Sequence, residues 1–193
     1  MGLQSRPPEV EAYEIAHDPS VAATPWAVRA GDAVIARFAS EALAEACADA
    51  LESARMQAGM PPPGDGWEMI RSRGFTRHAG PIWFRRDDRG LVFGFRALPK
   101  HRNSNGVIHG GMIMTFIDRI LGVAIVEEAP HVQPQATIQL DTHFVSGARV
   151  GEFVEARCAL TRATRAVAFA TATVYVGERI VAKAQGMWKL REG

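Results

Sequence analysis

The stretch NSNGVIHGGMIMTFIDRILGVAIVEE, residues 103–128, decides the fold expected for this chain. The 17 residues that begin at Gly110 are almost wholly apolar, yet Asp118 and Arg119 lie near their middle and His109 precedes them. A run that is apolar nearly all round predicts a helix covered on several sides. Burying an unpaired charge is costly, so the carboxylate in this helix needs an explanation.

Segments with the alternation of β-strands flank this helix on both sides. PIWFRR and LVFGFRA, joined through residues 87–90, come before it, and ATIQLDTHFV, EFVEARCALTRA, AVAFATATVYV and RIVAKAQGMWKL follow it. Gly177 and Glu178 form a two-residue connection between the last two segments, with glycine first as a type II′ turn requires. The order predicts an α+β fold in which a six-stranded antiparallel sheet is wrapped around one long helix.

The N-terminal part has a different pattern. Residues 1 to about 24 are expected to be loosely ordered, and WAVRAGDAVIARF and SEALAEACADALESAR predict a hairpin and an amphipathic helix, a small ββα unit over residues 25–57. The proline- and glycine-rich MPPPGDG at 60–66 predicts a boundary between an N-terminal extension, 1–60, and a main domain, 67–193. WEMIRSRGF, just after it, is interpreted as a short helix or an irregular entry.

Composition narrows the class of function. With 47% hydrophobic and 22% charged residues and a net charge of +1, the chain is typical of soluble globular proteins and offers no general attraction for nucleic acid. Cys47 and Cys158 are far apart, so packing explains them better than a metal site or a disulfide. The main apolar run is short and charged for a membrane span, and the polar start predicts no signal segment; a cytoplasmic location is expected.

The helix start offers groups suited to acyl chemistry. The first amides of a helix, here those of Gly110 and Gly111, have no acceptor within the helix and carry positive partial charge, so they can stabilise an oxyanion. Asp118 is eight residues from Gly110, about 12 Å along a helix axis, too far for both to act on one carbonyl. Two antiparallel copies of the helix could bring them together, which predicts a site shared by a dimer.

Each of these residues also has an ordinary structural interpretation. Asp118 could pair with a buried arginine or cap a neighbouring strand, His109 could be structural, and Asn103 could serve a turn that Gly106 permits. The combination at these spacings is more specific than any of its parts.

The segment HRNSNGVIHGGMIMTFID resembles the signature of hotdog-fold acyl-CoA thioesterases of the phenylacetate-degradation (PaaI-like) type, and the strand order after the helix is similar too. The resemblance covers about residues 67–193 and implies hydrolysis of an acyl-CoA to the free acid and CoA. It leaves the N-terminal unit without a functional interpretation.

By position, the resemblance implies a role for each residue of the motif. Asp118 corresponds to the general base or nucleophile, and the Gly110 amide to the group that polarises the thioester oxygen. His109 corresponds to a histidine that shapes the turn, Asn103 to a side chain that orients water or thioester, and Thr137 to a residue that positions the water. The two roles of Asp118 stay open.

The resemblance also implies the partners. The substrate is an acyl-CoA, the assembly is a homodimer or homotetramer with the site at a dimer interface, and no metal or redox cofactor is needed. Arg162 and Arg165, in the turn TRATRA, are candidates for the CoA phosphates, although solvated hairpin charges explain them equally well. Candidate walls of the acyl pocket are Trp83, Met112, Met114, Phe116 and Phe144.

Other functions stay to be weighed. A hotdog protein that binds acyl-CoA without turnover, as a sensor or carrier, has no need of the Asp118 carboxylate. A hotdog dehydratase usually places the aspartate shortly before the histidine, whereas here the aspartate follows on another element. The N-terminal unit could add a structural or interaction role to any of these.

Overall fold

The computed structural model describes residues 13–192, which form two compact units, one ending at Gly59 and one beginning at Met60. The first unit is a three-stranded antiparallel sheet in the order β1-β2-β3 followed by a helix. Its elements are β1 (Tyr13–His17), β2 (Trp26–Ala30), β3 (Ala33–Phe38) and α1 (Glu41–Gly59).

Strand β1 corrects the expectation that the chain before residue 25 is loosely ordered. Residues 1–12 lie outside the described part, but 13–17 pair with β2, and the unit is therefore βββα. Ile15 is opposite Val28, and the His17 ring lies 4.6 Å from that of Trp26. This short, polar strand is stabilised by its neighbour, and its own alternation is too brief to reveal it. Cys47 packs against the small core that contains Val28.

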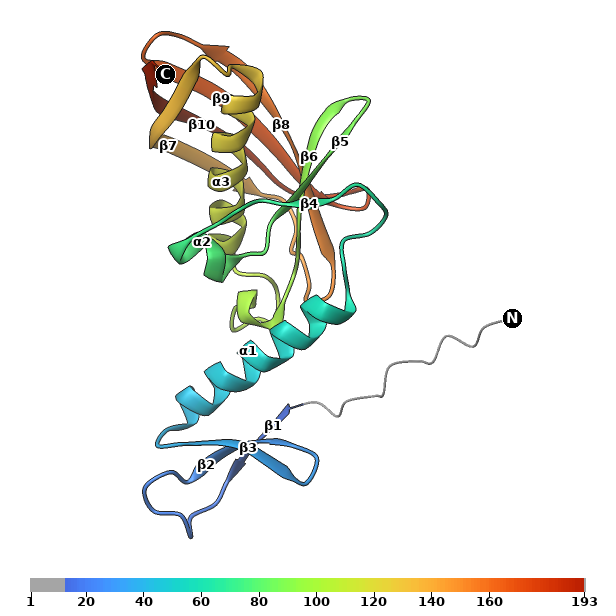
Figure 1. Ribbon diagram of the computed structural model, residues 1–193, viewed down its shortest axis with the longest axis vertical. Coiled ribbons are helices and arrows are strands. Elements are labelled where there is room, and N and C mark those ends of the chain that lie inside the picture. Colours follow the sequence, from blue (N-terminus) through green and yellow to red (C-terminus); the bar gives the residue numbers. More distant parts are fainter. Residues whose placement is uncertain (1–12, 193) are drawn as a thin grey trace, which may run out of the picture. The chain divides into compact units, whose positions relative to one another are not determined.

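The second unit is a seven-stranded antiparallel sheet in the order β4-β5-β6-β8-β9-β10-β7, with helix α3 packed along one face (Figure 1). Before α3 come β4 (Glu68–Met69), α2 (Gly74–Ala79), β5 (Trp83–Asp87), β6 (Gly90–Arg96) and the 3-10 turn η1 (Pro99–His101). After α3 (Gly110–Glu128) come β7 (Val132–Phe144), β8 (Phe153–Ala163), β9 (Val167–Val176) and β10 (Arg179–Glu192).

The sequence predicts six strands in this sheet, and the strand that it misses is β4. The segment WEMIRSRGF contains the two-residue strand β4 and the first residues of α2, so it is neither a single helix nor wholly irregular. The turn between β9 and β10 has Gly177 at φ 56°, in the left-handed region that its first position requires.

The core lies between α3 and the sheet. Three successive turns of α3 contribute Ile113, Phe116, Ile117, Ile120 and Leu121, each 2% exposed or less. They pack against the inward side chains of β6, β8, β9 and β10. Strand β7 is the edge strand beside β10, so it has an unpaired side along its 13 residues. That open edge lies next to the helix that carries the candidate site.

Candidate active site

Helix α3 begins at Gly110, and His109 is its N-cap. The Gly111 amide donates a hydrogen bond to Nδ1 of His109 at 2.8 Å, while the His109 amide donates to the carbonyl of His101 at 2.8 Å. Because Nδ1 accepts, the imidazole proton is placed on Nε2. The histidine therefore fixes the shape of the helix start through hydrogen bonds.

The Gly110 amide has no hydrogen-bond acceptor among residues 13–192. It is the first amide of a 19-residue helix, where the partial positive charge of the helix favours an anionic oxygen. A Cβ on Gly110 would lie 3.1 Å from Cζ of Phe144, and one on Gly111 would lie 2.9 Å from Nδ1 of His109. Both glycines thus leave room for rings that press on the helix start.

Asn103 organises the loop that leads to this helix. Its Oδ1 accepts from the amides of Asn105 at 2.9 Å and Val107 at 3.3 Å, and its own amide donates to the Val107 carbonyl at 2.7 Å. Gly106 completes the turn at φ 78°. The side-chain carbonyl oxygen is therefore used within the loop, and the side-chain NH2 group is the part left to act on another molecule.

Asp118 lies on the side of α3 that faces β7. The Thr137 hydroxyl donates to Oδ1 of Asp118 at 2.6 Å, and the carboxylate is half-buried. Within residues 13–192, Oδ2 of Asp118 accepts no hydrogen bond and no cation pairs with the carboxylate. Arg119 instead donates to the Arg71 carbonyl at 3.4 Å. The structure thus offers no arginine partner for Asp118, the ordinary interpretation that the sequence left open.

A β-bulge aims Thr137 at the helix. Thr137 is opposite Trp188 while Gln139 is opposite Met187, so Ile138 is an extra residue in β7. Without it, alternation would put Thr137 and Gln139 on the same face. With it, Thr137 contacts α3, whereas Gln139 lines a groove on the other face. Sequence alternation alone could not reveal this change of face.

The structure brings the sequence-predicted residues together in two groups. Asn103, His109 and Gly110 meet at the start of α3, and Asp118 and Thr137 meet two turns further along. No hydrogen bond in the described part of the chain joins one group to the other. One protomer therefore holds an amide half and a carboxylate half about 12 Å apart along the helix axis.

An apolar cavity of about 240 Å³ borders the amide half. Its lining includes Val107, Gly110, Ile113, Phe144, Ala148 and Val181. Of the other candidate walls, Phe116 and Met112 belong to the core, at 0% and 8% exposed, and Trp83 is not part of this lining. Met114 is more exposed but does not line the cavity either.

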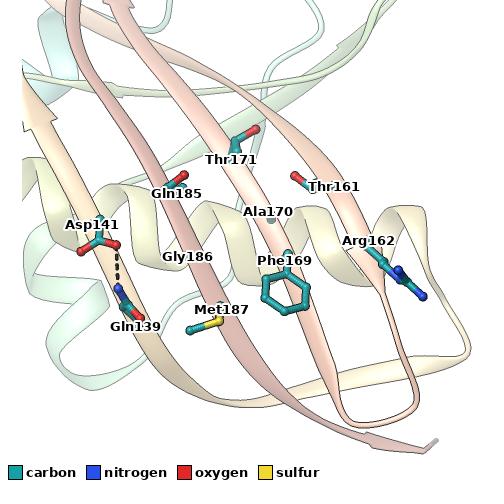
Figure 2. Close-up of a pocket in the computed structure, with 10 residues that line it drawn as sticks. All are labelled: Gln139, Asp141, Thr161, Arg162, Phe169, Ala170, Thr171, Gln185, Gly186 and Met187. Atoms are coloured by element: carbon teal, nitrogen blue, oxygen red, sulfur yellow. Dashed lines mark hydrogen bonds between the residues drawn. The ribbon is translucent and has the colours of Figure 1, made fainter.

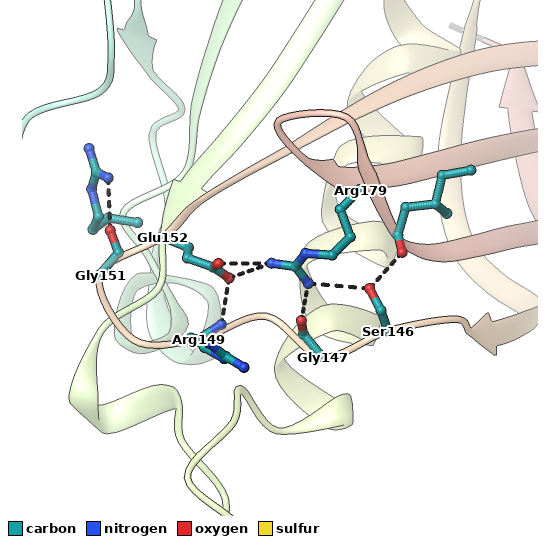
Figure 3. Close-up of polar contacts among 8 residues, drawn as sticks. Ser146, Gly147, Arg149, Gly151, Glu152 and Arg179 are labelled. Carbon is teal, nitrogen blue, oxygen red and sulfur yellow. Dashed lines mark hydrogen bonds and ion pairs between the residues drawn. The ribbon is translucent and has the colours of Figure 1, made fainter.

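Arg179, which sequence reasoning missed, holds the loop behind this cavity. Arg179 donates to both oxygens of Glu152 at 2.8 Å, to the Ser146 hydroxyl at 3.3 Å and to the Gly147 carbonyl (Figure 3). Glu152 also accepts from the Arg149 amide at 2.7 Å. These contacts join two segments far apart in the sequence, which explains why no local motif indicates them.

Arg162 lies near the end of β8, and Arg165 lies in the turn that follows it. Arg162 lines a groove of about 500 Å³ on the face of the sheet opposite α3, with Gln139, Asp141 and Phe169 (Figure 2). Gln139 donates to Asp141 there at 2.7 Å. Arg165 is exposed in the turn between β8 and β9.

No group of three or more His, Cys, Asp or Glu residues within 13–192 is arranged to hold a metal ion. No helix in that range is long and apolar enough to cross a membrane. Cys158 is packed against the core, and burial raises the pKa of its thiol well above the usual range.

A family model of the thioesterase superfamily matches residues 105–183, which include Gly110, Asp118 and Thr137. A Pseudomonas aeruginosa protein provisionally named esterase PA0474 is 36% identical over 123 residues, covering 63% of this chain and 92% of the relative. The chain belongs to the thioesterase superfamily.

Several solved structures share the fold of this chain. Conserved protein PA5202 of Pseudomonas aeruginosa has a TM-score of 0.55 at 21% identity, over 62% of this chain and 95% of its own. Zebra fish thioesterase superfamily member 2 has a TM-score of 0.50 at 18% identity, over 72% and 95%. A hypothetical thioesterase of Streptococcus pneumoniae, solved with coenzyme A, has 0.50 at 16%, over 66% and 90%. The predicted hotdog fold is confirmed.

Proposed function

We propose that the protein is a cytoplasmic acyl-CoA thioesterase whose site combines the carboxylate half of one protomer with the amide half of another. The observation that carries the proposal is the Asp118 carboxylate, held by Thr137 on an otherwise apolar helix whose first amide, that of Gly110, has no acceptor within residues 13–192. Membership of the thioesterase superfamily supports the class of reaction.

The proposed chemistry needs two groups at the thioester. The Gly110 amide donates to the carbonyl oxygen and stabilises the negative charge that develops there. Asp118 takes a proton from water as the water oxygen attacks the carbonyl carbon; the C–S bond then breaks, and CoA leaves as a thiol after gaining that proton. In the second route the carboxylate itself attacks, CoA leaves, and water hydrolyses the resulting anhydride.

The proposed partner is a second copy of the chain. Strand β7 has a free edge in the protomer, and Ile138, Phe144 and Val145 on or just after it are each more than half exposed. Natural proteins rarely leave so long and apolar an edge uncovered. Antiparallel pairing of two β7 edges would also place the two α3 helices in opposite directions, as the separation of the halves requires. A homotetramer would pair two such dimers.

For the CoA moiety, we propose that Arg162 and Arg165 contact phosphate groups. Arginine binds phosphate through a planar set of donors, and both residues lie at or near the exposed turn between β8 and β9. Val167, just after that turn, is opposite Lys189, which is opposite Ala136, so the turn lies level with the carboxylate half and two strands away from it. Coenzyme A is present in the Streptococcus pneumoniae thioesterase structure.

Release of free thiol from a panel of acyl-CoAs, with wild type and Asp118→Asn side by side, tests the proposal. The amide substitution keeps the shape of the side chain and its bond to Thr137 but removes the charge. We expect turnover of at least one acyl class and a loss of about 10²–10⁴-fold in the variant, the usual contribution of a general base. Near-normal kcat in folded Asp118→Asn would refute the mechanism, and no hydrolysis by folded wild type would favour a binding protein.

A further inference from the structure

Part of the wall of the cavity beside Gly110 consists of residues that cannot easily move, while another part of the cavity is open to solvent. Ile113, Ala148 and Val181 are each 2% exposed or less and belong to the packed core. Core side chains are held at crystal-like density, so they resist a change of shape. The size of the group that this cavity can hold therefore depends on the lining residues that lie outside the core.

The loop 145–148, which forms another wall of the cavity, is also held in place by hydrogen bonds. The Ile108 amide donates to the Ala148 carbonyl at 2.8 Å, and the Val145 amide donates to the Val181 carbonyl at 2.8 Å. The contacts of Arg179 with Ser146, Gly147 and Glu152 add a second set of bonds to the same loop (Figure 3). Backbone that is hydrogen-bonded on both sides gives this wall a set position.

Phe144 is the aromatic side chain of the lining and, like its neighbour Val145, it lies outside the core. It is 54% exposed, stands at the end of β7, and presses its ring on the helix start, where a Cβ on Gly110 would lie 3.1 Å from Cζ. The bulge at Ile138 gives Leu140, and by alternation Phe144, the face toward α3. The ring thus borders both the cavity and the amide that we assign to the thioester oxygen.

We propose that Phe144 sets the upper size of the acyl group by closing the cavity beside Gly110. This rests on the proposed function, since it is the thioester oxygen at the Gly110 amide that directs the acyl group into the cavity. An apolar cavity of about 150 Å³ holds a benzene ring. In proportion, the 240 Å³ here suits an acyl group of one ring with a short link, or a chain of roughly ten carbons.

Two substitutions should move this limit in opposite directions. Phe144→Ala removes the ring and should raise the ratio of kcat/KM for dodecanoyl-CoA to that for hexanoyl-CoA by about tenfold or more, the discrimination that one or two methylenes give in an apolar pocket. Phe144→Trp should lower the same ratio. Structural damage alone would not shift the ratio in opposite directions in the two variants. As a control, Phe169→Ala removes an exposed ring from the outer face of the sheet and should leave the ratio unchanged.

Binding measured by calorimetry in the Asp118→Asn background separates this proposal from the proposed function. If wild type hydrolyses no acyl-CoA, the proposed function fails, but the affinity series from acetyl- to hexadecanoyl-CoA still reports the size limit and its dependence on residue 144. An unchanged chain-length profile in folded Phe144→Ala and Phe144→Trp would overturn the role of Phe144. Loss of all acyl discrimination in folded Phe144→Ala would do so too, because the ring would then support the site without limiting it.

Discussion

The two halves of the candidate site are built in different ways. The amide half, at the start of α3, is held by several backbone hydrogen bonds, by the N-cap of His109 and by the turn around Asn103. The carboxylate half depends on one side-chain hydrogen bond, from Thr137 to Asp118. The comparison teaches that a group can be held in place by many backbone contacts or by a single side-chain bond, and that the second arrangement leaves Oδ2 of Asp118 without a hydrogen bond within residues 13–192.

After Asp118→Asn, the largest effect is expected where the amide half presents a side chain. Asn103→Ala removes both the oxygen that holds the loop and the NH2 donor, and should lower kcat by about 10²–10³-fold, as loss of one oriented donor does in comparable sites. Asn103→Asp keeps an oxygen for the amides of Asn105 and Val107 but removes the donor.

These two variants separate the roles of Asn103. If the donor acts on water or thioester, Asn103→Asp should lose about 10²-fold in kcat while its melting temperature stays near that of wild type. Wild-type kcat in Asn103→Asp would show that Asn103 serves only the loop. Steady-state kinetics and a thermal melt on the same samples give both answers.

The next largest effect is a pH dependence of stability that comes from His101. Its carbonyl accepts from the His109 amide, and the residue is 5% exposed. Burial, with a smaller effect of the Lys100 charge, lowers the pKa of His101 from 6.5 to about 4. The unfolded chain therefore binds a proton that the folded chain excludes between these values. The free energy of unfolding should be unaffected by this group above pH 6.5 and should fall by about 3 kcal/mol as the pH drops toward 4.

Urea denaturation at a series of pH values checks this, with His101→Asn as the control. An asparagine oxygen can replace Nδ1 as acceptor for the Leu98 amide, which donates to it at 3.2 Å, but it does not titrate. Carboxylates contribute equally to both proteins, so the difference between them isolates the histidine. Equal slopes for wild type and variant between pH 6.5 and 4 would contradict the prediction.

The smallest effect is expected at the single bond of the carboxylate half. Thr137→Val keeps the side-chain shape but leaves Oδ1 of Asp118 without its donor, a hydrogen bond to a charged group worth about 1.5 kcal/mol or more. We expect kcat to fall about tenfold with KM little changed, and Thr137→Ser to restore it. If Thr137→Val lowered kcat as much as Asp118→Asn, the threonine would have a direct part in the reaction.

The amide half could be predicted from the sequence because its parts are local. Asn103, His109 and Gly110 lie within eight residues, and the apolar run after them indicates a buried helix from its composition alone. The α+β layout, with a sheet wrapped around one helix, followed from the order of helix and strands, and the resemblance implied the hotdog fold. By contrast, β4 and β1 are short strands that owe their conformation to neighbours, so their own sequences gave too little alternation to identify them.

The carboxylate half and the cavity were harder to predict because they depend on register. Thr137 could be proposed from a resemblance, but the bulge at Ile138 that turns it toward α3 depends on which residues of β10 lie opposite. Phe144 could be named only as one aromatic candidate among several. The contact of its ring with Gly110 depends on the same bulge. The contacts of Arg179 were also hard to predict, because they join residues about 30 positions apart in the sequence.

The open edge of β7 has a genetic consequence if two copies of the chain share each site. A chain that lacks the Asp118 carboxylate and a chain damaged at Asn103 would each be inactive alone. A mixed dimer of the two would contain one site with both defects and one site with neither. Two alleles that fail separately would then complement each other in the same cell, and each gene copy would depend on the quality of the other's product.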